Sequence, residues 1–152
     1  MAKKVFLETR SEPILLTLVG ISCHFKDFQL SYFLKQKLDL EFVKKDDFNG
    51  CSFYLSHDED HCNTYYLLGN RGQDTILLPE LKQTDFLLLV EGPFKKAQKE
   101  QLLEKIRAIK NVLTAFEVRF ETIKNYELML TDLELHHMNI VKEAKIKYSP
   151  VK

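Results

Sequence analysis

The order of elements predicted for this 152-residue chain is typical of an α+β protein built as a two-layer sandwich. Two amphipathic helical segments interrupt a series of short apolar runs, and turn sequences separate most of those runs from one another. This order predicts a mainly antiparallel sheet with both helices on one face. The length suits a real hydrophobic core, because a chain of this size buries roughly 70% of its unfolded surface.

The first strand is predicted directly after Pro13. Residues 14–21 form a continuous apolar run, as expected of a central strand that is buried on both faces. Apolar residues then recur at spacings of three and four over residues 28–38, which predicts the first helix. Asp27 precedes this segment, so we expect its carboxylate to cap the helix.

Between the two helices the apolar period changes to two, or to short continuous runs. Clusters of Asp, Asn and Gly separate these runs, as at the corners of an antiparallel meander. A Pro-Glu corner at residues 79 and 80 joins the last two of them. Five strands are predicted here, at residues 41–45, 51–56, 64–68, 76–78 and 85–90.

The second helix is predicted over residues 95–109, and the last strand over residues 112–118. Together with the strand at 85–90 they form a strand-helix-strand crossover, so the whole order is similar to the ferredoxin-like and ACT-like class. Residues 126–130 fit either a short strand or the start of a helix, and an amphipathic helix is predicted from residue 133 to 147. We therefore expect an α+β domain at 1–120 and a C-terminal helical extension at 121–152, packed on the domain or on a partner.

The stretch at residues 76–92 resembles the signature of a family of small bacterial proteins named for its motif, IPExxVD. Leu78 stands in the first position of that motif and Thr84 precedes its Asp, where the family has Ile and Val. The resemblance implies a shared fold over residues 13–118 and no activity, because no biochemical activity is assigned to the family. It rests on segments in matching order: VGISCH at 19–24, YYLL at 65–68, NRG at 70–72, Leu78-Pro79-Glu80 with Asp85, and LTAFE at 113–117.

Charge and cysteine content indicate where the protein works. The net charge is zero, which disfavours nucleic acid as a partner, since binding to phosphates depends on an excess of Lys and Arg. Three cysteines without a CxxC pair fit a reducing cytoplasm. The longest apolar run is far shorter than the roughly 20 residues of a membrane span, so no membrane association is expected. We expect no cofactor.

Catalytic chemistry has two candidate locations. Cys23 and His24 lie between the first strand and the first helix, where the positive end of a helix can lower the pKa of a thiol. The simpler interpretation is a small buried residue followed by a turn residue. Glu80 and Asp85 flank the Pro-Glu corner and are candidates for paired acid and base carboxylates, although a turn with an Asp that accepts backbone amides explains them more simply.

Two further groups are candidates for binding. His57, His61 and Cys62 have the side chains of a zinc site, but their surroundings predict an acidic loop rather than a helix, so we favour a solvated turn and no metal. Arg71 at a glycine turn, next to Tyr65 and Tyr66, offers a fork of donors to an anion.

No catalytic constellation is recognisable in the chain. We therefore predict a binding or protein-interaction module without catalytic activity, with a protein partner or self-association. The alternative is a thiol- or metal-dependent enzyme that uses Cys23, His24 and the cluster from His57 to Cys62. A weaker alternative is RNA contact through the basic side chains of the second helix.

Overall fold

The computed structural model describes residues 15–148, and the side chains up to residue 143. The chain separates into two compact units at residue 124. We call the part that ends at Ile123 the sheet unit, and the part that starts at Lys124 the C-terminal unit. The described residues contain one six-stranded sheet and three α-helices, which confirms the α+β class.

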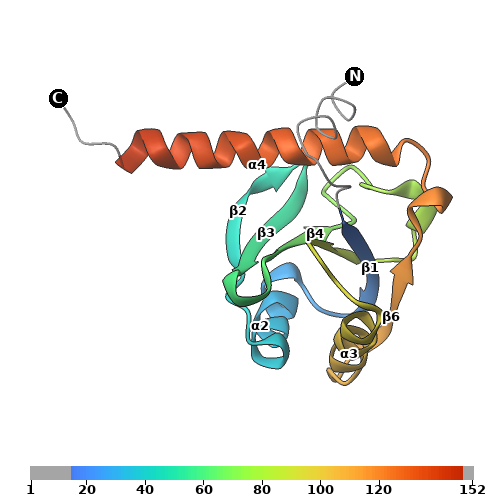
Figure 1. Ribbon diagram of the computed structural model, residues 1–152. Helices are drawn as coiled ribbons and strands as arrows, with labels where there is room; N and C mark the ends of the chain where they lie inside the picture. Colours follow the sequence, from blue (N-terminus) through green and yellow to red (C-terminus); the bar gives the residue numbers. More distant parts are fainter. Residues whose placement is uncertain (1–14, 149–152) are drawn as a thin grey trace. The chain divides into compact units, whose positions relative to one another are not determined.

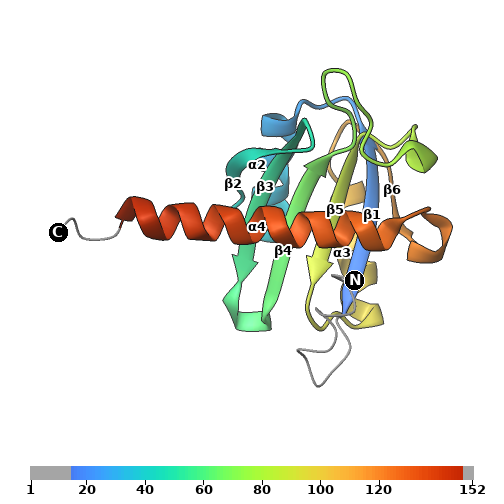
Figure 2. The same ribbon diagram turned by 90° about the horizontal axis from the view of Figure 1, so that it is seen from above.

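The sheet is antiparallel at every strand pair. Its strands lie in the order β2-β3-β4-β5-β1-β6, which Figure 2 shows across the sheet. The first strand of the chain therefore lies inside the sheet, between β5 and β6, and this position explains its continuous apolar sequence. The strands are β1 (Leu16–Cys23), β2 (Val43–Phe48), β3 (Cys51–Asp58), β4 (Asn63–Gly69), β5 (Phe86–Glu91) and β6 (Val112–Val118).

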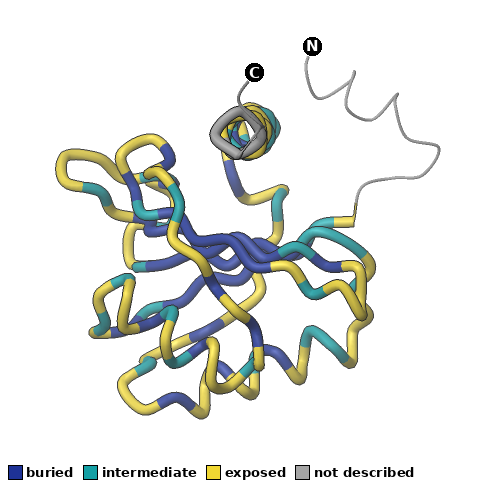
Figure 3. Tube along the Cα trace, turned by 90° about the vertical axis from the view of Figure 1, so that its left-hand side faces the viewer, coloured by how far each residue is buried: buried dark blue, intermediate teal, exposed yellow. Residues whose placement is uncertain are grey.

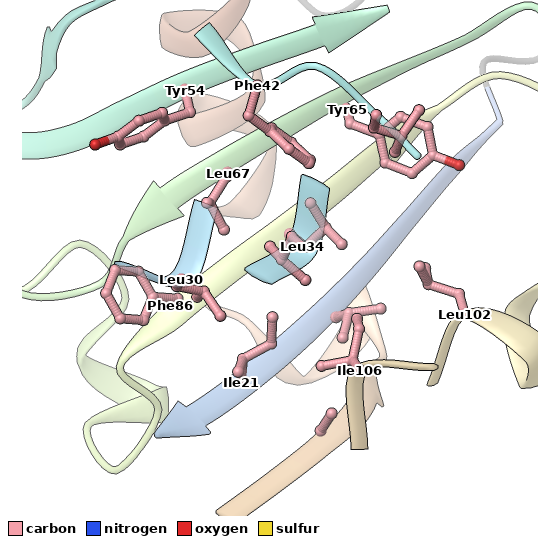
Figure 4. Packing of buried hydrophobic residues seen from close by; sticks show 14 of the residues in the cluster. Ile21, Leu30, Leu34, Phe42, Tyr54, Tyr65, Leu67, Phe86, Leu102 and Ile106 are labelled. Atoms are coloured by element: carbon pink, nitrogen blue, oxygen red, sulfur yellow. The ribbon is translucent and has the colours of Figure 1, made fainter. Parts of the chain in front are cut away.

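Two helices connect strands within the sheet unit. Helix α2 (Asp27–Leu38) runs from β1 to β2, and helix α3 (Lys96–Arg107) runs from β5 to β6. Figure 1 shows both on the same side of the sheet. Their buried side chains join alternate residues of five strands in one core cluster, in which Figure 4 shows Leu30, Leu34 and Ile106. The side chains that alternate with these on the central strands are buried as well, so the buried residues in Figure 3 follow the strands.

Two predictions about local structure are wrong. Residues 76–78 are not a strand: they make one isolated bridge, between Arg71 and Ile76, and a short 3-10 helix follows at Pro79–Leu81. The cap of α2 is Lys26, and Asp27 is the first residue of the helix. The carboxylate of Asp27 instead accepts a hydrogen bond from the Tyr54 hydroxyl (2.9 Å) and pairs with the Lys44 ammonium (3.2 Å).

The described C-terminal unit consists mainly of helix α4 (Tyr126–Tyr148). Residues 126–130 belong to this helix, so the choice between a strand and a helix is decided in favour of the helix. Two further 3-10 turns, Glu59–His61 and Phe120–Thr122, belong to the sheet unit. Among the described helices, none combines the length and the apolar character that crossing a lipid bilayer requires.

Candidate functional site

The Pro-Glu corner is organised by a buried asparagine, Asn70, which directly follows β4. Its amide nitrogen donates to the carbonyl groups of Leu81 and Thr84, both at 2.9 Å, and its amide oxygen accepts the N–H of Leu78 at 2.8 Å. One side chain thus replaces the strand pairing that the corner lacks. Asn70 therefore has a structural role.

The structure brings Cys23, Arg71 and Asp85 together at this end of the sheet. One carboxylate oxygen of Asp85 accepts the backbone N–H of Cys23 (3.0 Å), and the other lies 3.7 Å from Nε of Arg71. The Arg71 guanidinium also donates to the carbonyl of Lys82. Every one of these contacts ties two segments of backbone together, which fits a structural corner better than an acid and base pair.

The environment of Cys23 does not favour a thiolate. Burial raises the pKa of its thiol and outweighs the lowering by a hydrogen bond with the backbone of Phe25, and the nearby Asp85 charge adds a smaller rise. His24 is exposed and its backbone N–H donates to Asn111, while Glu80 is exposed on the 3-10 turn. The structure thus places Cys23 beside Asp85. A nucleophilic cysteine needs a lowered thiol pKa, and the pKa of this thiol is raised.

The potential metal ligands are separated by the end of a strand. His57 lies on β3 and its Nδ1 is 3.3 Å from the hydroxyl of Thr64, across the hairpin on β4. His61 lies in the following 3-10 turn and pairs with Asp58 at 2.9 Å, and Cys62 is exposed. Within residues 15–143, no three His, Cys, Asp or Glu side chains form a group that could hold a metal ion.

The predicted anion site of Arg71, Tyr65 and Tyr66 is not assembled. Neighbouring residues of a strand point to opposite faces, so Tyr65 enters the helix-side core while the Tyr66 hydroxyl donates to Glu91 at 3.1 Å. Arg71 lies beyond the far end of β4, about 20 Å along the chain from Tyr65. Tyr65 lines a pocket to which Tyr66 and Arg71 do not contribute.

This pocket, which we call the hairpin pocket, lies at the end of the sheet where β3 turns into β4. It has a volume of about 160 Å³. One wall is apolar and the other is polar, which is the composition of a small-molecule site. The lining residues are Leu38, Leu40, Asp58, His61, Asn63, Tyr65, Phe94, Gln98, Gln101, Leu102 and Lys105.

Four polar residues of the hairpin share the face that the pocket uses. Ser56 is paired with Tyr65 across the two strands, and Asp58 with Asn63, so all four side chains lie on the helix side. In the part of the chain whose side chains are described, two buried side-chain atoms lack a hydrogen-bond partner: Oγ of Ser56 and Oδ1 of Asn63. Both belong to this set of four. Unpaired buried polar atoms are rare in proteins, so their concentration here requires an explanation.

The orientation of the Asn63 amide is determined by its donors. Nδ2 donates to the carbonyl of Pro93 at 3.0 Å and to that of Glu91 at 3.4 Å. A flipped amide would place oxygen against two carbonyl oxygens, so Oδ1 is the atom left unpaired. Gly92 makes this contact possible, because a Cβ atom there would lie 2.4 Å from the carbonyl oxygen of Cys62.

Tyr65 is neutral in this setting. Burial, and secondly the charge of Asp58, raise the pKa of its hydroxyl to about 12. Its ring meets that of Phe94 edge to face, with 6.4 Å between the ring centroids. Figure 4 shows its hydroxyl directed outward from the core cluster. The residues that line the pocket therefore include a neutral tyrosine, an amide whose oxygen is buried and unpaired, and one carboxylate.

Comparison with known proteins adds no relative. The chain matches no protein-family model, and it has no match among the curated proteins. The sequence interpretation missed Asn63 and Ser56 and singled out Tyr65 for a different site. One signal was available: the polar Ser56 directly follows the apolar residues of one strand and Asn63 opens the next, although the pattern does not tell whether such a residue is paired.

Proposed function

We propose that this protein is a non-catalytic binding module and that the hairpin pocket is its ligand site. The observation that carries the proposal is that Asn63, which holds one of the two unpaired buried polar atoms, lines the pocket. Ser56, which holds the other, lies on the same face of the hairpin. Leaving a buried donor or acceptor without a partner costs about 1–3 kcal/mol, so a folded chain retains it where something else supplies the partner. A ligand in the pocket supplies that partner.

A binding role without catalysis is supported by the state of the titratable groups. The buried thiols of Cys23 and Cys51 have raised pKa values because of burial, and the Tyr65 pKa of about 12 keeps its hydroxyl protonated. A nucleophile or a general base needs a pKa close to the working pH. The pKa values of these groups are shifted away from neutral pH.

The test is a fragment screen of the full chain by protein-observed NMR. We expect hits that shift the amide resonances of Asp58, Asn63 and Tyr65 saturably and leave those of Arg71 and Asp85 unchanged. A library of several hundred polar fragments that yields no binder at the pocket at millimolar concentration would contradict the proposal.

A second candidate function is self-association through the β6 edge of the sheet. The two edge strands differ: β2 carries two Lys followed by two Asp and a register shift, which protect an edge, whereas β6 exposes Leu113 and Phe116. An antiparallel strand can pair with its own copy about a two-fold axis, so the fitting partner is a second copy of this chain. One edge carbonyl, that of Ala115, is already occupied by Arg107.

Sedimentation at increasing concentration tests this association. If β6 pairs with its copy, Leu113→Lys should leave the protein monomeric at concentrations where the unmodified protein is a dimer. Val43→Lys, an exposed apolar residue on the other edge, is the matched control and should not change the mass. A monomer at every concentration removes this function and does not affect the pocket.

We further propose membership of the IPExxVD family and an expanded ferredoxin-like arrangement. Strands β1, β4, β5 and β6 with α2 and α3 follow a β-α-β-β-α-β order, into which β2 and β3 are inserted, and this order supports the arrangement. A reducing cytoplasmic setting without nucleic-acid partners is supported by three free cysteines and by the zero net charge. Identifying homologous sequences that have the same pocket residues would test the family assignment.

A further inference from the structure

We infer that the hairpin pocket binds a primary ammonium group carried on a compact apolar body. This inference rests on the proposed binding function and adds the chemical class of the ligand. It follows from the size of the pocket, from the acceptors in its polar wall and from the charge that surrounds them.

The size of the pocket limits the ligand to a small molecule. A cavity of about 150 Å³ holds one benzene ring, and the hairpin pocket measures about 160 Å³. Sites for drug-sized ligands or nucleotides usually measure about 300 Å³ or more. The enclosed part of the ligand therefore corresponds to a single ring or a branched chain of a few carbons.

The polar residues of the pocket offer acceptors, so a fitting ligand carries hydrogen-bond donors. Oδ1 of Asn63 accepts only, and its orientation is fixed by the two bonds of Nδ2 to backbone carbonyls. Asp58 lies opposite Asn63 on the paired strand and contributes a second acceptor. Its Oδ2 also pairs with His61 at 2.9 Å. A group with several N–H donors satisfies both residues together.

Charge selects a cation for that position. The pKa of Tyr65 is raised by burial and by the Asp58 charge, so a negative charge at the Tyr65 hydroxyl is unfavourable. Burial disfavours a ligand charge of either sign, and the Asp58 charge disfavours a ligand carboxylate and favours an ammonium group. The basic side chains of the lining are Lys105 and His61, and both are exposed, so solvent and salt screen them.

The apolar wall fits the remainder of such a molecule. Leu40 and Leu102 are buried, and Leu38 and Phe94 are partly buried against the same core. They present aliphatic and aromatic carbon to the pocket, and this surface is stabilised when an apolar body displaces water from it. The ligand thus has its ammonium group at Asn63 and Asp58 and its carbon atoms against these four apolar side chains.

Three nearly isosteric probes test the inference on the full chain: isoamylamine, isoamyl alcohol and isovalerate. In NMR titrations, isoamylamine should shift the pocket amides saturably, and the alcohol should bind at least about tenfold more weakly because it lacks the charge-assisted hydrogen bonds. Isovalerate should not bind. Equal or tighter binding of the alcohol or of isovalerate would overturn the ammonium class and leave the proposed binding function intact.

A pair of variants separates charge from structure. Asp58→Asn should weaken isoamylamine about tenfold and leave the affinity for the alcohol unchanged, whereas a merely structural role would reduce both affinities. Asp60→Asn, in the same turn but outside the lining, is the matched control and should change neither. If isoamylamine binds Asp58→Asn as tightly as the unmodified protein, the inference is wrong. If no probe and no fragment reaches the pocket, the proposed function itself is wrong.

Discussion

Two buried asparagines stand at opposite ends of β4, and their surroundings differ. Asn70, at the corner end, is fully buried and uses its amide oxygen and nitrogen in hydrogen bonds to Leu78, Leu81 and Thr84. Asn63, at the hairpin end, is 3% exposed and uses only its nitrogen. The residue type and the burial are alike, so the difference lies in the amide oxygen, which is paired at Asn70 and unpaired at Asn63.

The comparison separates a structural site from a candidate binding site on one strand. At the corner end, Asp85 and Arg71 also reach backbone groups, and each contact closes the path of the chain. At the hairpin end, Ser56 and Asn63 retain unpaired atoms and Tyr65 lines a pocket. Residues with a complete set of intramolecular partners have nothing left for a ligand, and those with an incomplete set do.

Thiol labelling gives the largest expected contrast between the two ends. Cys62, at the hairpin end, is exposed, while Cys23, at the corner end, is 6% exposed and has a pKa raised by burial. We expect an aromatic disulfide reagent to react with Cys62 more than about a hundredfold faster, because Cys23 reacts only after local opening. Mass spectrometry of each cysteine over time measures the ratio, and comparable rates would restore the reactive-thiol hypothesis.

Replacing each asparagine by alanine measures the two roles directly. Asn70→Ala takes the side-chain partner from the Leu78 N–H and from the Thr84 carbonyl, whereas the Leu81 carbonyl keeps its bond from the Thr84 N–H. We therefore expect a loss of about 3–5 kcal/mol in the free energy of unfolding. Asn63→Ala removes two donor bonds and one unpaired oxygen, so we expect about 1–2 kcal/mol. Urea denaturation of the two variants gives both values. Equal losses would show that Asn63 is as structural as Asn70.

The sequence predicted those elements whose pattern is local. The apolar run of β1 and the periodicity of α2 place both elements within two residues of their observed ends, because a strand buried on both faces and an amphipathic helix each leave a pattern in consecutive residues. The error at residues 76–78 has a non-local cause. Asn70 holds that segment through bonds to residues up to fourteen positions away, and an apolar run carries no sign of them.

The candidate site was beyond prediction for the same physical reason. The unpaired oxygen of Asn63 depends on the path of Gly92 and Pro93, which lie about thirty residues further along the chain. Tyr65 and Tyr66 are adjacent in the sequence, yet strand geometry sends them to opposite faces. Sequence reasoning therefore identified a pair of tyrosines, and only the register of β3 on β4 shows which of them meets Asp58 and Asn63.

Tyr54 provides a paired counterpart to Tyr65 on the neighbouring strand. The two residues are 5% and 6% exposed, but the Tyr54 hydroxyl donates to Asp27 at 2.9 Å. We expect Tyr54→Phe to lower the free energy of unfolding by about 1 kcal/mol, since a hydrogen bond to a charged acceptor is lost. Thermal and urea denaturation measure the loss. An unchanged stability would mean that solvent replaces this bond fully.

Asp27 makes part of this stability dependent on pH. Burial acts to raise its pKa, but hydrogen bonds from Tyr54 and Lys44 outweigh burial and lower the pKa below its ordinary value. Because the folded-state pKa is the lower one, the contribution is present above the unfolded-state pKa of about 4 and is lost as the pH falls through the folded-state pKa. The stability difference between the unmodified protein and Asp27→Asn should therefore shrink on acidification below that unfolded-state pKa. Urea denaturation at neutral and acidic pH measures it, and a difference that is constant with pH would contradict the assignment.

Tyr65→Phe should have the smallest effect on stability, and it separates a binding role of the hydroxyl from a structural one. The described residues show no hydrogen bond from its hydroxyl, and burial together with Asp58 already disfavours its ionised form. Removing a hydroxyl that has no hydrogen-bond partner among the described residues should leave the free energy of unfolding within about 0.5 kcal/mol of its original value, or raise it. The same variant should alter the affinity of the hairpin pocket for its ligand, because Tyr65 lines the pocket. Stability that stays constant while affinity changes would assign the hydroxyl to binding, whereas a loss comparable to that of Tyr54→Phe would make the hairpin end as fully paired as the corner end.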